Sequence, residues 1–161
     1  LKDLGGRAEA YAEKAHSINP KGIDALAWYN SSYGYHASSL GILQAILKGA
    51  GGKLKKLANE LIEADDAYAD ALGYRMMGRF HLNAPFPVGS KKKAIEYLER
   101  AVQRAPGSLF NNYWLGEAYL TKEKIAQANK EFQFVLDHPP SAEEKHFSEA
   151  TKEAAKKRLS H

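Results

Sequence analysis

The stretch of sequence that decides the fold is residues 108–140, SLFNNYWLGEAYLTKEKIAQANKEFQFVLDHPP. Four of its residues repeat the spacing of four earlier residues at a constant distance of 34 positions: Ala128, Phe132, Val135 and Pro140 follow Ala94, Leu98, Ala101 and Pro106. A fixed period of this length is typical of a helical repeat. Small residues let two helices approach closely, large residues fill the gap between them, and the proline ends the second helix.

The same spacing of four, three and five residues occurs twice more toward the N-terminus. One set is Ala8, Ala12, Ala15 and Pro20, and the other is Leu57, Leu61, Ala64 and Ala69. The first set predicts the second helix of a repeat whose first helix is missing or atypical, as expected at the end of an array. We therefore expect a single domain with a partial repeat at 4–20, an expanded repeat at 22–69, repeats at 70–106 and 108–140, and a C-terminal capping helix at 141–159.

Local signals place the helix ends. Ser90 is a good N-cap for a helix at 91–104. Ser141 with Glu144 three residues later has the pattern of a capping box, which predicts that the last helix opens there. Residues 38–48 are extra relative to a plain repeat, and their apolar spacing predicts a short helix of their own. The fold class is all-α, with about nine antiparallel helices stacked into a right-handed superhelix.

The register of residues 71–140 resembles that of tetratricopeptide repeats. That family places Leu-Gly and Tyr in the first helix of a repeat, then Ala, a large residue and Pro in the second. This sequence has, in register, Leu115, Gly116, Tyr119, Ala128, Phe132 and Pro140. It departs from the family at the third small position, where Val135 stands. The resemblance implies a binding scaffold and names no ligand.

A closer resemblance covers residues 22–158 and involves two groups of divergent tetratricopeptide proteins. It is carried by the extra segment at 38–48, the loop at 83–89 and two motifs, Tyr74-Arg75-x-x-Gly78-Arg79 and Asn111-Asn112-Tyr113-x-Leu115-Gly116. The sequence is similar to the T component of tripartite ATP-independent periplasmic (TRAP) transporters and to the regulator of microtubule dynamics family. The motifs do not choose between the two groups.

The two groups imply different settings for the protein. The transporter group implies a bacterial periplasmic lipoprotein that binds a substrate-binding subunit and holds apolar ligands. Its lipid-bearing cysteine is absent here, so we expect an anchor upstream of the given sequence. The second group implies a eukaryotic adaptor in the cytoplasm or at the mitochondrial surface. A periplasmic location is slightly favoured over a cytoplasmic one, and the compartment stays open.

Composition excludes several classes of function. The chain has 161 residues, of which 44% are hydrophobic and 26% charged, and its longest apolar-leaning run is too short to span a membrane. It contains no cysteine, which excludes disulfides, thiolate metal sites and cysteine nucleophiles. The net charge of +4 is mild and the lysines are scattered, so we expect no nucleic-acid partner.

The candidate catalytic patterns are weak. Gly51-Gly52-Lys53 lacks the Ser or Thr and the preceding strand of a phosphate-binding loop. The six histidines form no pair four residues apart, and the acids at 60–66 share one helix rather than facing each other. We therefore expect a protein that is not an enzyme, with no catalytic residues, no metal site and no cofactor.

The candidate binding site is on the inner surface, which the first helix of each repeat lines in this family. The repeat register places seven residues there: Tyr29, Tyr33, His36, Arg75, Arg79, Tyr113 and Glu117. Arginines four residues apart can bind a carboxylate bidentately while tyrosine rings cover apolar surface. The alternative is that Arg79 pairs with Glu117 or another acid inside the fold.

Two functions are consistent with this pattern. The first is a protein-interaction scaffold that binds a protein or peptide partner through its concave face. The second is a transporter-associated carrier that holds a small apolar or carboxylate ligand in a cavity between helices. A homo-oligomer is compatible with either function. A closed apolar cavity would favour the carrier, and an open groove would favour capture of a peptide.

Overall fold

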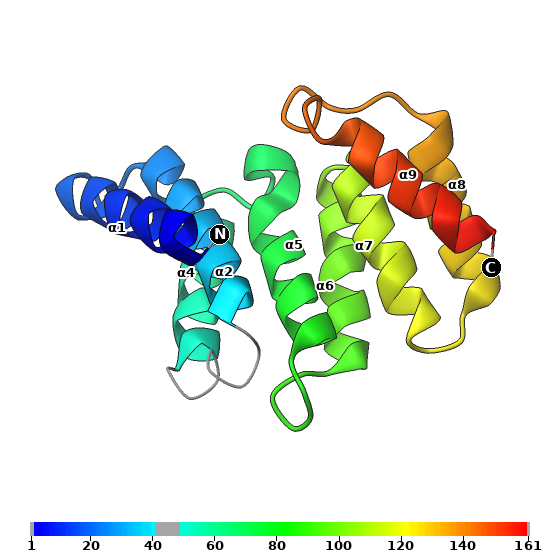
Figure 1. Cartoon of the computed structure of the whole chain (residues 1–161), viewed down its shortest axis with the longest axis horizontal. Helices are drawn as coiled ribbons and strands as arrows, with labels where there is room; N and C mark the ends of the chain where they lie inside the picture. The colour runs from blue at the N-terminus through cyan, green and yellow to red at the C-terminus, as the bar shows by residue number, and fades with distance from the viewer. Residues whose placement is uncertain (1, 41–48, 161) are drawn as a thin grey trace.

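The computed structural model describes residues 2–40 and 49–160, and all regular structure in this part of the chain is helical (Figure 1). Its eight helices are α1 (Lys2–Ile18), α2 (Ile23–Leu40), α4 (Ala50–Ala64), α5 (Tyr68–Asn83), α6 (Lys91–Arg104), α7 (Leu109–Leu120), α8 (Ile125–Asp137) and α9 (Ser148–Leu159). The all-α prediction is confirmed. Of the short helix predicted at 38–48, residues 38–40 continue α2, and residues 41–48 lie outside the described residues.

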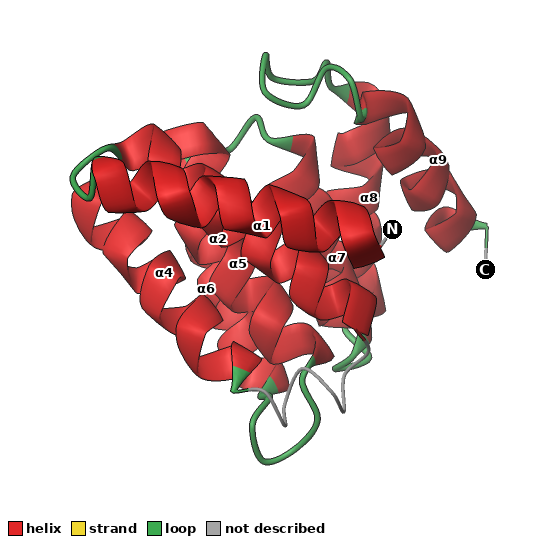
Figure 2. Cartoon of the chain, turned by 60° about the vertical axis from the view of Figure 1, so that its left-hand side comes forward, coloured by secondary structure: helices red, strands yellow, loops and turns green. Residues whose placement is uncertain are grey.

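Helices that are neighbours in the sequence pack against each other and form a layered array (Figure 1). Helix α1 packs on α2, α5 on α6, and α7 on α8. Contacts of α4 with α5 and of α6 with α7 join each layer to the next. Helices α1 and α9 lie at opposite ends of the array, and in the turned view α1 lies in front of the other helices (Figure 2).

Close glycine contacts hold the helix pairs together. A β-carbon placed on Gly116 would lie 2.7 Å from Cε1 of Phe132, and one placed on Gly78 would lie 2.4 Å from Cγ of Leu98. Both large side chains are completely buried. A small residue in one helix therefore receives a large residue of the next, as the repeat spacing predicts, and no larger side chain fits without displacement.

The serines at helix starts act as the local sequence predicts. Ser90 Oγ accepts a hydrogen bond of 3.3 Å from the backbone N–H of Lys93, and α6 covers residues 91–104 as expected. Ser108 has the same role at α7, where its Oγ accepts from the N–H of Asn111 at 3.1 Å. These bonds satisfy donors that have no partner within their own helix.

The predicted capping box at the last helix is not formed. Helix α9 begins at Ser148, and residues 141–147 form turns instead. The Glu144 carboxylate is buried at the start of α7, where it accepts from the N–H groups of Leu109 and Phe110 at 2.8 and 2.9 Å and from Ser108 Oγ at 2.5 Å. A carboxylate at a helix N-terminus is stabilised by the unpaired N–H donors and by the helix dipole. Glu144 therefore caps α7 and does not cap a helix that begins at Ser141.

The junction between α4 and α5 is a turn and not continuous helix. Helix α4 ends at Ala64, and the backbone of Ala69, Asp70 and Ala71 is left-handed, with φ of 48°, 58° and 57°. Left-handed residues other than glycine cost about 1–2 kcal/mol each. The carbonyl oxygen of Asp70 accepts hydrogen bonds from the side chains of Arg75 and Asn111, which hold this turn in place.

His81 of α5 packs inside the fold. The ring is buried, and it stacks on Tyr97 with a centroid distance of 5.8 Å and an interplanar angle of 9°. Its Nδ1 has no hydrogen-bond partner among the described residues. Burial, and then the charges of Lys93 and Lys55, hold the pKa of His81 below its ordinary value of 6.5.

Stability should therefore fall in mild acid because of His81. Near pH 6.5 the unfolded chain binds a proton at this residue, whereas the folded chain binds it only at lower pH, so acidification favours unfolding. Replacing His81 with phenylalanine keeps an aromatic ring at this position and removes the titration. Thermal melts between pH 8 and pH 5 should show a smaller loss of Tm for His81→Phe than for the unmodified chain. An equal loss in both proteins would show that His81 is not the responsible group.

Candidate functional site

A cavity of about 840 Å³ lies between α2, α4, α5 and α7. Its volume is within the range of about 300–1,000 Å³ that is usual for small-ligand sites. Most of the wall is apolar, and the apolar residues that line it include Gly34, Leu72, Met76, Phe80, Phe110 and Trp114. Among the described residues, the cationic side chains in its wall are those of Lys55, Arg75 and Arg79. The arrangement is that of an apolar pocket, partly open to solvent, with cationic groups in its wall.

Arg75 is fixed by the protein itself. Its side chain is buried, and Nη1 donates to Asn111 Oδ1 at 2.9 Å and to the Asp70 carbonyl at 3.0 Å. Burial lowers the pKa of Arg75 to about 10, and the carboxylates of Glu144 and Asp70 oppose that shift. Since both of these hydrogen bonds go to groups of the protein itself, Arg75 forms part of the framework of the cavity.

Arg79 is held in a different way. Its guanidinium carbon lies 4.4 Å from the centroid of the Trp114 ring, which is a cation–π contact. Its Nε is buried without a hydrogen-bond partner, and the described residues provide no carboxylate within ion-pair distance. Residues 41–48 contain no Asp or Glu either. Burial alone lowers the pKa of Arg79.

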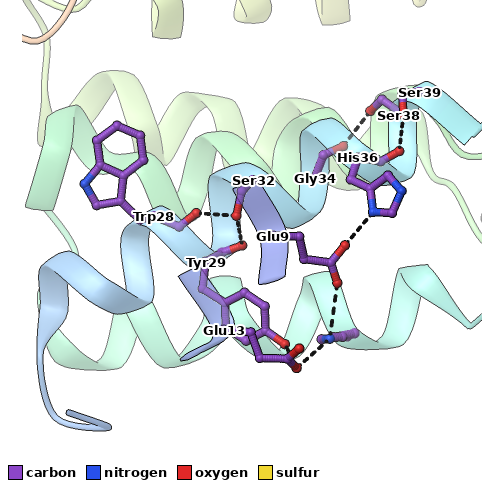
Figure 3. Close-up of polar contacts among 10 residues, drawn as sticks. Glu9, Glu13, Trp28, Tyr29, Ser32, Gly34, His36, Ser38 and Ser39 are labelled. Carbon is purple, nitrogen blue, oxygen red and sulfur yellow. Dashed lines mark hydrogen bonds and ion pairs between the residues drawn. The ribbon is translucent and has the colours of Figure 1, made fainter. Parts of the chain in front are cut away.

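Three of the predicted site residues lie away from the cavity. Tyr29, Tyr33 and His36 are directed from α2 toward α1 and α4, and Figure 3 shows two of their polar partners. The Tyr29 hydroxyl donates to the carboxylate of Glu13, and His36 Nδ1 lies 2.5 Å from Glu9 Oε2. The prediction that these three side chains line the inner surface with Arg75 and Arg79 is therefore wrong.

Lys53 of α4 completes this second cluster. Its Nζ lies 4.9 Å from the centroid of the Tyr29 ring and 4.8 Å from that of Tyr33. The same Nζ is 3.2 Å from Glu13 Oε1 and 3.5 Å from Glu9 Oε1. Lys53 therefore pairs with both carboxylates, so the cluster joins three helices and its ammonium is already neutralised within the protein.

Tyr113 and Glu117 belong to a third environment, at the contact with α8 and α9. The Tyr113 ring packs against Phe132 at a centroid distance of 5.7 Å. Glu117 accepts two hydrogen bonds from Arg158, at 2.5 and 2.8 Å. The alternative in which Glu117 neutralises Arg79 is therefore also wrong.

The predicted inner surface differs from the observed cavity wall because α2 and α7 present other faces to the cavity than the repeat register predicts. From α2 the cavity is lined by Ser31, Gly34, Tyr35 and Ser38, and from α7 by Phe110 and Trp114. Gly34 gives the reason, because a β-carbon there would lie 2.5 Å from Cε of Met76 in α5. The close contact turns this face of α2 inward. The spacing of Phe110 and Trp114, four residues apart like Arg75 and Arg79, was the signal available in the sequence.

No protein-family model matches the chain, and no curated protein matches its sequence. Within residues 2–40 and 49–160, none of the helices combines the length and the hydropathy needed to cross a membrane.

Proposed function

We propose that the protein is a non-enzymatic binding protein of the tetratricopeptide type, whose cavity accepts an anionic group attached to an apolar body. The observation that carries this proposal is Arg79, a partly buried cation in the cavity wall with no acidic partner among the described residues. A buried charge that lacks a partner is costly to maintain. An anionic ligand would supply the missing partner.

The chemistry of the cavity wall restricts the class of ligand that fits it. A guanidinium presents its donors in a fixed fork that matches a carboxylate, and a charge-assisted hydrogen bond contributes about 1.5–3 kcal/mol. The cation–π contact with Trp114 holds the Arg79 guanidinium against the ring. The remaining wall offers mainly apolar contacts, so a small, fully hydrated dianion fits it poorly. A monocarboxylate with an aliphatic or aromatic body fits both parts.

The test compares octanoate with octan-1-ol, which has the same chain without the charge. A Trp28→Phe variant leaves Trp114, in the cavity wall, as the single tryptophan of the chain. Titration followed by Trp114 fluorescence should show octanoate binding at least tenfold more tightly than octan-1-ol, since one charge-assisted bond corresponds to about tenfold or more. Equal affinities would show that the cavity selects only for apolar bulk and would remove the anionic part of the proposal.

A protein-interaction scaffold is our second proposal, with a partner that places an acidic side chain in the same cavity. It is supported by Tyr35, which lines the cavity and is 55% exposed, and by Trp28 on the same helix, which is 72% exposed. A protein partner would cover Trp28 and protect it from acrylamide quenching, whereas octanoate would not. The resemblance to the transporter component favours the small ligand, and the resemblance to the microtubule regulators favours the partner.

A further inference from the structure

Helix α1 carries an apolar stripe that no described helix covers. It consists of Leu4, Ala8, Tyr11, Ala15 and Ile18, all of which are exposed. The three large members have exposed fractions of 62%, 71% and 75%. The neighbouring row of the helix, Gly5 and Ala12, is buried against α2. Because α1 lies at the end of the array (Figure 1) and in front of the other helices in Figure 2, its uncovered side is open to a partner.

The spacing of the stripe specifies the shape of that partner. Steps of four, three, four and three residues repeat every seven positions, which is the seam of a coiled coil. One set of seam positions is alanine and the other is large, so a facing helix can approach closely at Ala8 and Ala15. An apolar seam of this length is unusual on a surface that stays in water. The expected partner is therefore a helix with an apolar seam of its own.

The edge of the stripe specifies the charge of the partner. Arg7 and Lys14 precede the two alanines directly and occupy the flank that α2 does not cover. Both are exposed, and neither forms an ion pair with a described residue. Asp3 lies one row further from the seam. Charges flanking a seam choose the partner by complementarity, so acidic residues are expected opposite Arg7 and Lys14.

A second copy of this chain does not satisfy that condition. Two α1 helices paired antiparallel would place alanines against large residues, which suits packing. The same pairing would set Arg7 of each copy near Lys14 of the other, and like charges across an interface are unfavourable. We infer that the α1 stripe is a docking surface for an amphipathic helix of another protein that carries acidic residues along one edge.

The test uses two synthetic peptides of four heptads each, with heptad positions lettered a to g. Positions a and d form the seam and positions e and g flank it. Both peptides have Ala at every a position and Leu at every d position. One peptide has Glu at all e and g positions and the other has Lys there. Fluorescence anisotropy with the full chain should show the Glu peptide binding at least tenfold more tightly than the Lys peptide. Failure of both peptides to bind, or equal affinities, would overturn the inference.

Charge reversal in the protein sharpens this test. Arg7→Glu combined with Lys14→Glu should reverse the preference toward the Lys peptide, and Tyr11→Lys should weaken both peptides at least tenfold. The matched control is Lys93→Glu with Arg100→Glu, two exposed basic residues with the same spacing on α6, which should leave the preference unchanged. A dimer in light scattering that Tyr11→Lys converts to monomer would overturn the inference in favour of a second copy.

Discussion

Replacing Glu144 with alanine should be among the most destabilising single changes in this chain. The carboxylate is 1% exposed and accepts hydrogen bonds from the N–H groups of Leu109 and Phe110 and from Ser108 Oγ. The alanine variant leaves both N–H groups without an acceptor, at about 1–3 kcal/mol each. We therefore expect the free energy of unfolding to fall by roughly 2–6 kcal/mol, as measured by chemical denaturation.

Two further variants separate this effect from a general sensitivity of the 141–147 segment. Glu143→Ala changes the neighbouring, exposed carboxylate and should leave stability almost unchanged. Glu144→Gln keeps one acceptor oxygen and loses the charge, so it should have an intermediate effect. If Glu144→Ala were no worse than Glu143→Ala, the carboxylate would not be holding the start of α7.

Replacing Arg79 with methionine should weaken the binding of octanoate at least about tenfold without destabilising the fold. Arg79 has no acceptor among the described residues, and burial of its guanidinium already disfavours the charged form, as its lowered pKa indicates. Methionine has a similar length and removes that burial cost, while the cation–π contact with Trp114 is worth about 0.5–2 kcal/mol. The two terms oppose each other, so Tm should stay unchanged or rise while affinity falls at least tenfold, which is about 1.4 kcal/mol.

Arg75→Met is the matched control, because it makes the same change one helical turn away. Arg75 donates to Asn111 and to the carbonyl of the left-handed turn at Asp70, so its replacement leaves buried acceptors unpaired and should lower Tm. The reverse pattern, with Arg79→Met unstable and still binding octanoate, would assign Arg79 a structural role.

The helices themselves were largely predictable because their signals are local. The small and large residues of α6 and α8, the N-cap Ser90 and the proline at 106 lie within one or two turns of the structure that they specify. Tertiary packing has little effect on where these helices begin and end. The predicted bounds of α6 are therefore the observed ones.

The candidate site was predicted only in part because it depends on long-range choices. Arg75 and Arg79 both line the cavity, but the rotation of α2 is set by the contact of Gly34 with α5. Likewise, Glu144 caps the N-terminus of α7, 35 residues away, and not the helix predicted to begin at Ser141. A sequence pattern shows that a carboxylate or a ring is available. It does not show which of several distant partners offers the larger gain in free energy.

In the function that we propose, Arg79 supplies the positive charge that an anionic ligand contacts in the cavity. The most direct test is the ¹⁵N–¹H spectrum of arginine Nε–Hε groups, with the Arg79 signal assigned from its loss in Arg79→Met. Saturating octanoate should shift that signal as the buried Nε gains an acceptor, and octan-1-ol should leave it nearly in place. An Arg79 signal that octanoate leaves unchanged, or that both compounds shift equally, would contradict the account.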